Sequence, residues 1–340
     1  MKALVLESFG GPLVIQDVPI PDPGEGQVLV RVMACAPDQF DLTVRDGKFP
    51  SAKTPIILGH EIAGVVEKAG AGVTNFSNGT RVTSTLYLTC GRCRQCRAGR
   101  ETICENFIGY LGIHTPGGYA EYTSVPAVNL ARIPDDLPFP EASILANAIG
   151  TPYHAFTKRA RLRPGEYVMI TGAGGGVGLH AVQIARMMGA LVMAVDIGAE
   201  KLEAALANGA DRAVDPEAAD FAEAALEWTE GRGVDVVLEL VGPATMPGSL
   251  KAMGKGARMV IVGSHTGTEL AIRPQTMISN EWEILGSRNV TKRELQEVVE
   301  LVAAKRVKPV VTEVHPLEDA EAVHARLRQG KIIGRVALEP

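Results

Sequence analysis

The stretch VMITGAGGGVGLHAVQIARMMGA, residues 168–190, decides the fold of the second half of the chain. It predicts a strand that ends at Thr171, a glycine-rich turn, and a helix that opens near Val177. Glycines let the turn tighten and let backbone N–H groups approach a pyrophosphate, and the helix N-terminus adds the positive end of a dipole. We therefore expect a dinucleotide-binding loop rather than the plain alternative, a tight turn without a ligand. The expected cofactor-binding residues are Thr171, Gly172, Gly175, Gly176, Val177 and Gly178.

The next strand, LVMAVD (191–196), ends on an acidic residue. Asp196 stands 18 residues after Gly178. A carboxylate at this place accepts hydrogen bonds from a ribose 2′-hydroxyl and repels a 2′-phosphate. The sequence therefore favours NAD over NADP as the cofactor.

Strands and helices alternate around this loop. The runs EYVMIT (166–171), LVMAVD (191–196), VDVVLELVG (234–242) and ARMVIVG (257–263) are apolar throughout and are separated by helical patterns. Such alternation indicates a parallel sheet that is covered on both faces. Residues 1 to about 140 instead carry short apolar runs between glycines and prolines, which predicts a β-rich unit. The fold class we expect is α/β: a doubly wound parallel sheet (a Rossmann domain) together with a β-rich domain.

The bulk properties exclude several classes of function. A length of 340 residues favours two domains, and a net charge of −5 leaves no basic field for a nucleic-acid backbone. No apolar run approaches the roughly 18 residues that span a bilayer, and MKALVLESFG at the start reads as a strand rather than a signal peptide. We expect a cytoplasmic protein that acts on a small-molecule substrate, without a nucleic-acid or membrane partner.

Four cysteines lie within sixteen residues, in TCGRCRQCRAGRETIC (89–104). Cys90, Cys93, Cys96 and Cys104 follow the spacing C-x2-C-x2-C-x7-C. Without a secretory signal, clustered cysteines favour a metal over disulfides, although two disulfides remain the alternative. A closed shell of four thiolates leaves no open position for a substrate, so a zinc here would be structural. The fifth cysteine, Cys35, is expected to be a small buried apolar residue.

Taken together, these motifs resemble the medium-chain dehydrogenase/reductase superfamily, also called the zinc-type alcohol dehydrogenase family. The resemblance rests on GHEIAGVVEKAGAGV (59–73), GGYAEY (117–122), the closing GKIIGRVAL (330–338), the cysteine cluster and the glycine loop. It implies a GroES-like substrate domain at 1–146 and 287–340, with a structural zinc lobe at about 88–106, and a Rossmann domain at 147–286. It also implies a homodimer or homotetramer joined through the last Rossmann strands, near 265–286. By resemblance, Gly263 and Ser264 are candidates for the nicotinamide side of the cofactor site, and Arg335 for the cofactor cleft.

The resemblance also implies where a catalytic zinc would be held. Members of the family use a Cys, the His of a G-H-E motif and a later Cys or carboxylate, and the motif is intact here as Gly59, His60 and Glu61. The other two positions are filled by Asp38 and Asn147. Asp and His are good zinc ligands and Asn is a weak one, so we expect Asp38 and His60 to bind a possible catalytic zinc with help from Glu61 or Asn147.

The usual proton relay of the family is missing. Phe40 takes the place of the relay Ser or Thr, and Thr43 stands where many relatives have a His. A phenyl ring cannot pass a proton, and a Thr hydroxyl has no pKa near 7. The catalytic site, if it holds zinc, is therefore atypical.

Three functions remain open at this stage. One is an NAD(P)-dependent alcohol or carbonyl oxidoreductase with an atypical zinc site. The second is a zinc-free reductase of quinones or activated C=C bonds, which the loop GAGGGVG and the spacing of Asp38, Asp41, Arg45 and Gly47 favour. The third is a cofactor-binding protein without turnover, because a glycine loop by itself indicates binding only.

Overall fold

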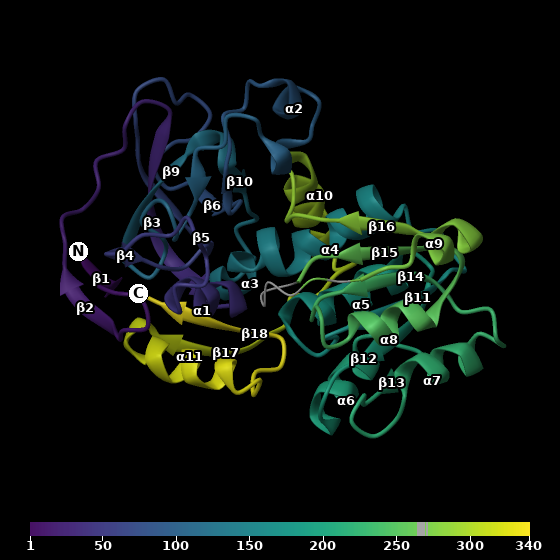
Figure 1. Cartoon of the computed structure of the whole chain (residues 1–340). Coiled ribbons are helices and arrows are strands. Elements are labelled where there is room, and N and C mark those ends of the chain that lie inside the picture. The colour runs from purple at the N-terminus through teal and green to yellow at the C-terminus, as the bar shows by residue number, and fades with distance from the viewer. Residues whose placement is uncertain (264–268, 270) are drawn as a thin grey trace. The chain divides into compact units, whose positions relative to one another are not determined.

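The computed structural model describes residues 1–263, 269 and 271–340, and it separates the chain into two compact units (Figure 1). The first unit consists of Met1–Gly150, Asn289–Ala304 and Val311–Pro340. The second unit consists of Thr151–Arg288 and Lys305–Val310. Among the described residues, no helix is both long enough and apolar enough to cross a membrane.

The segment Lys305–Val310 differs from the predicted division, which placed it in the first unit. Its backbone is hydrogen-bonded to α5 (Gly176–Met187) of the second unit. The N–H of Val310 donates to His180 Nε2 at 2.9 Å, and the N–H of Lys308 donates to Gln183 Oε1 at 2.8 Å. The partners lie 130 and 125 residues apart in the chain, so no local sequence pattern could indicate these contacts.

The first unit is built on a seven-stranded sheet whose central strand is β3 (Gln27–Ala36). Strand β3 pairs with β5 (Glu61–Ala69) along most of its length, and also with β9 (Tyr122–Pro126) and β18 (Arg335–Glu339). The sheet continues through β6 (Arg81–Ser84) and β10 (Leu130–Arg132) on one side and β17 (Val311–Pro316) on the other. The C-terminal strand therefore shares one sheet with the strand that follows His60.

Shorter elements complete the first unit. A three-stranded sheet is formed by β1 (Lys2–Leu6), β2 (Leu13–Asp17) and β4 (Ile56–Ile57), and β7 (Tyr87–Leu88) pairs with β8 (Gly109–Tyr110). The helical segments are α1 (Gln39–Arg45), α2 (Arg94–Arg97), α3 (Phe139–Ser143), the π-helix Leu145–Ile149, α10 (Lys292–Ala303) and α11 (Ala320–Arg328). Short 3-10 helices lie at Glu101–Ile103, Ala127–Asn129 and Leu317–Asp319.

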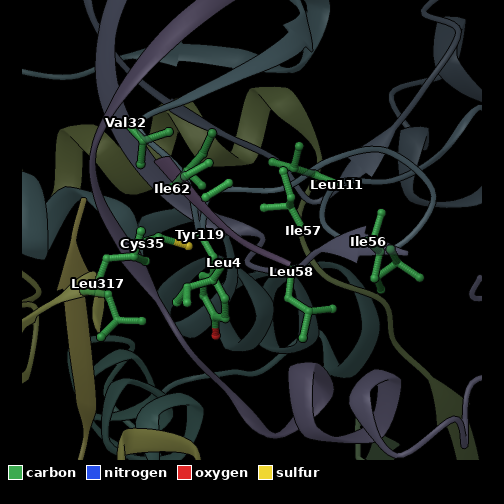
Figure 2. Close-up of a cluster of buried hydrophobic side chains, with 14 of the residues drawn as sticks. Leu4, Val32, Cys35, Ile56, Ile57, Leu58, Ile62, Leu111, Tyr119 and Leu317 are labelled. Carbon is green, nitrogen blue, oxygen red and sulfur yellow. The ribbon is translucent and has the colours of Figure 1, made fainter. Parts of the chain in front are cut away.

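The apolar core of the first unit collects side chains from strands and loops that are distant in sequence. Figure 2 shows Leu4, Val32, Ile62, Leu111 and Leu317 within this cluster. Cys35 is one of its members, and its exposed fraction is 0%, which confirms the predicted buried apolar role. A fully buried thiol in this position packs as a small hydrophobe.

The second unit is a six-stranded parallel sheet in the order β13-β12-β11-β14-β15-β16. Its strands are β11 (Tyr167–Thr171), β12 (Leu191–Val195), β13 (Arg212–Val214), β14 (Val234–Glu239), β15 (Met253–Ile261) and β16 (Glu283–Gly286). The helices are α5, α6 (Ala199–Ala207), α7 (Phe221–Trp228), α8 (Met246–Ala252) and α9 (Pro274–Asn280), with α4 (Gly150–His154) and the π-helix Ala155–Ala160 leading into β11. This is the strand order of a doubly wound dinucleotide-binding sheet, and it confirms the predicted fold class.

Two glycines shape the turn between β11 and α5. Gly172 has φ +66°, in the left-handed region that favours glycine. A Cβ at Gly178 would lie 2.1 Å from the carbonyl oxygen of Gly172, so the first turn of α5 packs directly on the end of the strand. The helix N-terminus is thereby held close to the point where the strand ends.

Gly178→Ala should destabilise the second unit by about 2–4 kcal/mol, because the added methyl group meets a backbone oxygen that cannot move aside. Chemical denaturation of the cofactor-free protein measures the loss. Gly175→Ala is the matched control, since Gly175 has φ −78° and its Cβ would meet the oxygen of Gly172 at 3.5 Å, an ordinary contact. Equal losses for the two variants would contradict this account of the turn.

Candidate functional site

Six polar side chains of the first unit come together around His60. We call them the His60 cluster, and they are Asp38, Asp41, His60, Glu61, Asn147 and Arg335. All are buried except Asn147, which is partly exposed. Buried polar groups must be paired with one another or with an ion, so the contacts within this cluster define what it can do.

Asp38 is held by the start of helix α1. Its Oδ1 caps the helix by accepting from the N–H of Phe40 at 2.7 Å and from the N–H of Asp41 at 3.2 Å. Asp41 returns the contact by accepting from the N–H of Asp38, which completes a capping box. The second oxygen, Oδ2, is thereby turned toward His60, whose Nε2 lies 3.4 Å away.

His60 and Glu61 stand where strand β5 begins. Gly59 before them has φ +92°, and a Cβ there would lie 2.4 Å from the ring of Tyr119 and 2.6 Å from the sulfur of Cys35. Only glycine fits this position, because the backbone is left-handed and packed against the core. The G-H-E motif therefore places an imidazole and a carboxylate side by side at the start of strand β5.

Asn147 projects from the π-helix Leu145–Ile149 to the same point. Its Nδ2 lies 2.9 Å from Asp38 Oδ2, 2.8 Å from Glu61 Oε1 and 3.3 Å from His60 Nε2. Its Oδ1 accepts from Asn289 Nδ2 at 3.0 Å. The structure thus brings together all four predicted catalytic residues, with the amide end of Asn147 at their centre.

Arg335 belongs to this cluster but was predicted only as a candidate for the cofactor cleft. It opens strand β18, and its guanidinium donates to Glu61 Oε1 at 2.7 Å and lies 3.5 Å from Asp38 Oδ2. The signal in the sequence was an arginine that enters an apolar closing strand, since a buried arginine requires an acidic partner. The sequence could not name that partner, which lies 274 residues away.

The electrostatics of the cluster favour positive charge at its centre. Burial disfavours an imidazolium, yet Asp38 and Asp41 outweigh burial and hold the pKa of His60 well above its ordinary value. Burial raises the pKa of Glu61 despite the nearby Arg335. Burial would also raise the pKa of Asp38, but His60 and Arg335 hold it well below its usual range. The acidic groups of this cluster therefore attract cations.

Asp41 sets the orientation of the His60 ring from behind. His60 Nδ1 lies 3.2 Å from Asp41 Oδ1, and the hydroxyl of Tyr119 donates to Asp41 Oδ2 at 3.0 Å. A carboxylate only accepts, so Nδ1 carries a proton and, in the neutral ring, Nε2 presents its lone pair to Asp38 and Asn147. A His held in this way by a carboxylate is prepared to bind a metal through Nε2.

The hydrogen bonds continue from Tyr119 toward helix α11, a connection that the sequence did not indicate. Tyr119 Oη lies 2.9 Å from His324 Nε2, and His324 Nδ1 lies 3.4 Å from Arg45, which in turn is paired with Glu321. Burial lowers the pKa of His324, and arginine can only donate. His324 is therefore a neutral donor to Tyr119, and this chain of contacts directs the Tyr119 hydroxyl proton to Asp41.

Aromatic rings cover one side of His60. The ring of Phe40 lies 5.8 Å from the imidazole and packs edge-on against Phe49 and Tyr110, at 5.2 and 6.0 Å between ring centroids. The Thr43 hydroxyl donates to the carbonyl of Gln39 at 3.0 Å, inside helix α1. Neither Phe40 nor Thr43 is placed to move a proton, so these positions exclude water rather than relay charge.

The four clustered cysteines also converge. The Sγ–Sγ separations are 4.0 Å for Cys90 and Cys96, 3.5 Å for Cys93 and Cys96, 3.9 Å for Cys93 and Cys104, and 3.5 Å for Cys104 and Cys90. Thiolates about 2.3 Å from a tetrahedral zinc lie about 3.8 Å apart. Backbone N–H groups lower the pKa of Cys90 and lower the pKa of Cys93 to about 6, whereas burial raises the pKa of Cys96 and of Cys104. This group can hold a zinc ion.

The second unit places most of the predicted cofactor residues around one loop. Thr171 ends β11, Gly175 is the N-cap of α5, and the first turn of α5 holds Gly176, Val177 and Gly178. Asp196 Oδ2 accepts from the N–H of Gly174 at 2.8 Å, and Oδ1 accepts from the N–H of Ile197 at 2.8 Å. Gly263 follows β15, and Ser264 lies outside the described residues. The loop and the acidic residue that the sequence paired are thus in direct contact.

Comparison with known proteins assigns both halves of the chain. Residues 24–135 match the alcohol dehydrogenase GroES-like domain, and residues 176–304 match the zinc-binding dehydrogenase domain. An alcohol dehydrogenase of Geobacillus stearothermophilus is 40% identical over 100% of this chain and 99% of its own length. The chain belongs to the zinc-binding dehydrogenases of the medium-chain dehydrogenase/reductase superfamily. The predicted family and enzyme class are confirmed.

Different relatives of this dehydrogenase are named for different activities. An acryloyl-coenzyme A reductase of Metallosphaera sedula is 33% identical over 99% of both chains. The crystal structure of an NAD-dependent alcohol dehydrogenase superposes with a TM-score of 0.94, at 36% identity over 100% of both chains. Family membership therefore fixes the fold and the reaction type, an oxidoreduction, but not the substrate.

The donor atoms of the His60 cluster fit a catalytic zinc. Oxygen and nitrogen ligands about 2.0–2.1 Å from a tetrahedral zinc lie about 3.4 Å apart. The separation of Asp38 Oδ2 and His60 Nε2 is 3.4 Å, and the amide end of Asn147 lies 2.9 and 3.3 Å from these two atoms. An amide flip would present Oδ1 of Asn147 instead of Nδ2, and the Asn289 amide can reverse with it. When His60 is neutral, Asp38, Asp41 and Glu61 carry three negative charges and Arg335 carries one positive charge. A divalent cation would balance the net charge of −2.

Cys96→Ser should release one zinc per chain and lower the unfolding temperature by about 5 °C or more, because a four-thiolate site contributes its binding energy to folding. Elemental mass spectrometry and a thermal melt measure the two effects. Cys35→Ala is the control, since this cysteine lies in the apolar core and should leave the zinc content unchanged. Unchanged zinc in the Cys96 variant would contradict a metal-holding role for this group.

Proposed function

We propose that this dehydrogenase interconverts an alcohol and the corresponding carbonyl compound, with NAD as the hydride carrier and a catalytic zinc held by Asp38 and His60. Glu61 or Asn147 would complete the ligand set. The observation that carries the proposal is the separation of 3.4 Å between Asp38 Oδ2 and His60 Nε2, which suits a tetrahedral ion, with the Asn147 amide 2.9 and 3.3 Å from these two atoms. The full-length similarity to alcohol dehydrogenases supports the same substrate class.

Zinc held here would supply Lewis-acid chemistry to the oxygen of an alcohol or carbonyl substrate. The residues of this chain prepare the site for it. Asp41 keeps the lone pair of His60 Nε2 directed at the centre, and the capping box fixes Asp38. Phe40 shields His60 from water, which strengthens every electrostatic contact inside the cluster.

Arg335 controls the availability of Glu61. While the guanidinium holds Glu61 Oε1 at 2.7 Å, this carboxylate is already neutralised and is the weaker candidate for a ligand. Asn147 would then be the third protein ligand, through an amide oxygen that carries no charge. An oxygen- and nitrogen-rich set of this kind binds zinc less tightly than a set with thiolates. We therefore expect the catalytic zinc to be removed by chelators before the zinc of the cysteine group.

A second function is favoured by a different observation. The Asn147 amide nitrogen and the Arg335 guanidinium already satisfy Asp38 and Glu61 in this structure, so the cluster also forms a complete hydrogen-bonded set by itself. This supports the alternative of a zinc-free reductase of activated C=C bonds or quinones. The acryloyl-coenzyme A reductase among the relatives is consistent with this alternative.

Zinc content separates the two functions. Under the alcohol dehydrogenase proposal, protein purified without added metal should hold two zinc ions per chain, and His60→Ala should hold one, because the variant loses the central ligand. Elemental mass spectrometry gives both counts, and oxidation of a panel of alcohols should fall at least about 100-fold in the variant. Cys96→Ser is the matched control, since it should lose the other ion.

One zinc in both the wild type and His60→Ala would overturn the catalytic zinc. The reaction should then be sought with enones, quinones and enoyl thioesters, in the presence of NADH or NADPH. Activity toward these acceptors without a second zinc would establish the alternative function.

Asp196 supports NAD as the preferred cofactor. Its carboxylate is fixed at the glycine loop by two backbone N–H groups, and Lys201 Nζ lies 3.6 Å from Oδ1. A fixed carboxylate accepts from the ribose 2′-hydroxyl and repels a 2′-phosphate. We therefore propose that this side chain sets a preference for NAD over NADP.

Asp196→Ser should raise the ratio of kcat/KM for NADP to kcat/KM for NAD by at least about tenfold. The variant no longer repels the 2′-phosphate of NADP, which can then contact Lys201. Steady-state kinetics with both cofactors measure the ratio. Glu203→Ser, at an exposed position of α6, removes the same charge from the surface and should leave the ratio unchanged. A shift of equal size in both variants would mean that general surface charge, rather than Asp196, sets the preference.

The quaternary structure belongs to the same proposal. Strand β16 lies at the edge of the sheet and pairs with β15 on one side only, among the residues that the structure describes. An open edge can pair with the same edge of a second copy. We propose a homodimer or homotetramer that is joined through this strand.

A further inference from the structure

Glu239 is a buried carboxylate that ends strand β14 in the second unit. Its exposed fraction is 0%, and its two oxygens accept five hydrogen bonds from the chain. The donors are the hydroxyls of Thr171 at 2.7 Å, Thr245 at 2.7 Å and Ser249 at 2.8 Å, and the backbone N–H groups of Val241 and Gly242 at 3.0 Å each. No other carboxylate among the described residues of this unit is held by so many neutral donors.

The contacts of Glu239 leave no room for a proton on Oε1. Backbone N–H groups only donate, and the Thr171 hydroxyl accepts from the N–H of Leu240 at 3.0 Å, so its own proton is directed to Oε1. Oε2 meets the Ser249 hydroxyl, which donates to it when the side chain is a carboxylate. Among the described residues, no lysine, arginine or histidine lies within ion-pair distance of this carboxylate. Neutral dipoles stabilise the charge without cancelling it, so its field extends to the surroundings.

Glu239 lies at the carboxyl edge of the sheet, where a dinucleotide is expected to bind. Strands β11 and β14 are neighbours at the middle of the sheet. The chain adds β12 and β13 on one side of this pair and β15 and β16 on the other. Dinucleotides bind at the carboxyl ends of the strands where the strand order reverses in this way. A dinucleotide bound there would place its adenosine part on the half that contains β11, β12 and Asp196, and its nicotinamide part on the half that begins with β14.

The loop after β14 faces the other parts of the expected cofactor site. A Cβ at Gly172 would lie 3.2 Å from Val241 Cγ2, and a Cβ at Gly263 would lie 2.0 Å from the carbonyl oxygen of Leu240. The glycine loop and the end of β15 are thus both packed against residues 240–241. Glu239 lies directly beneath this junction and bonds to Thr171 on one side and to the loop on the other.

We propose that Glu239 is a positioning residue whose uncompensated charge stabilises the cationic ring of NAD⁺ relative to the neutral ring of NADH. The inference rests on the proposed use of NAD and adds a function that the cofactor loop alone does not have. Hydride addition to the nicotinamide removes its positive charge, so a nearby fixed anion favours the oxidised cofactor on the enzyme. Bound NADH is then a stronger hydride donor, which favours reduction of the carbonyl substrate.

The experiment compares the dissociation constants of NAD⁺ and NADH for the wild type and for Glu239→Gln. The glutamine retains an oxygen acceptor for the four donors at Oε1, and its amide nitrogen can donate to Ser249. We expect the ratio Kd(NAD⁺)/Kd(NADH) to rise about tenfold, since unit charges about 10 Å apart interact by that much at an effective dielectric constant near 20. Tryptophan and NADH fluorescence, with calorimetry for NAD⁺, give both constants.

Two further variants separate charge from structure. Glu239→Asp retains the carboxylate and should keep the ratio within about threefold of the wild type, even where both constants weaken. Ser249→Ala removes one hydrogen bond but no charge and should also preserve the ratio. If Glu239→Gln fails to fold, Val241→Lys places a cation next to the carboxylate at a position that is 41% exposed, with Val241→Gln as its uncharged control. The lysine variant should raise the ratio relative to the glutamine variant.

Equal weakening of both cofactors in Glu239→Gln, or equal ratios for the two Val241 variants, would overturn the electrostatic role and leave Glu239 as a purely structural residue. A wild type that binds neither NAD⁺ nor NADH would instead overturn the proposed use of NAD. The two failures are distinguishable because the first leaves wild-type binding intact.

Discussion

A buried acid that requires a cation organises the first unit. Glu61 is fully buried at the start of β5, and an ionised carboxylate in such a place is unstable unless a partner reaches it. The partner is Arg335, which enters at the first residue of β18. Because β18 and β5 both pair with β3, the ion pair joins the C-terminal strand to the strand of the G-H-E motif. Removing Arg335 would leave Glu61 without its cation, whereas removing Glu61 would leave Arg335 with Asp38 as its remaining acidic partner, at 3.5 Å.

The same pairing decides how the site divides its charges. Arg335 neutralises Glu61, and the Tyr119–His324 contacts stabilise Asp41, so Asp38 is the carboxylate whose second oxygen faces His60. Each acid therefore has a separate role. Glu61 pairs with Arg335 and so joins β5 to β18, Asp41 orients the imidazole of His60, and Asp38 faces His60 Nε2 with its second oxygen. Partners of this kind fix the orientation of a metal ligand, as the N–H groups of α1 do for Asp38 and as Asp41 does for His60.

Sequence reasoning was sufficient wherever the pattern is local. The glycine loop predicted strand, turn, helix and second strand in order, and the observed sheet follows that order. The cysteine spacing and the G-H-E motif each place their own side chains, because a short segment determines the geometry. The residues that sequence reasoning missed depend on distant partners, as in the Arg335–Glu61 pair, the His324–Tyr119 contact and the docking of Lys305–Val310 on α5. A buried polar residue reveals that it needs a partner, but its own segment does not say which one.

Glu61 and Glu239 show two solutions to the same physical problem, with different consequences. Both carboxylates have an exposed fraction of 0%. An arginine cancels the charge of Glu61, so little field remains beyond the pair. Hydroxyls and backbone N–H groups satisfy Glu239 without adding positive charge, so its field persists at the end of the sheet. Because its partners carry no positive charge, the Glu239 carboxylate can act on a cationic ring bound at that end of the sheet, which the paired Glu61 cannot do.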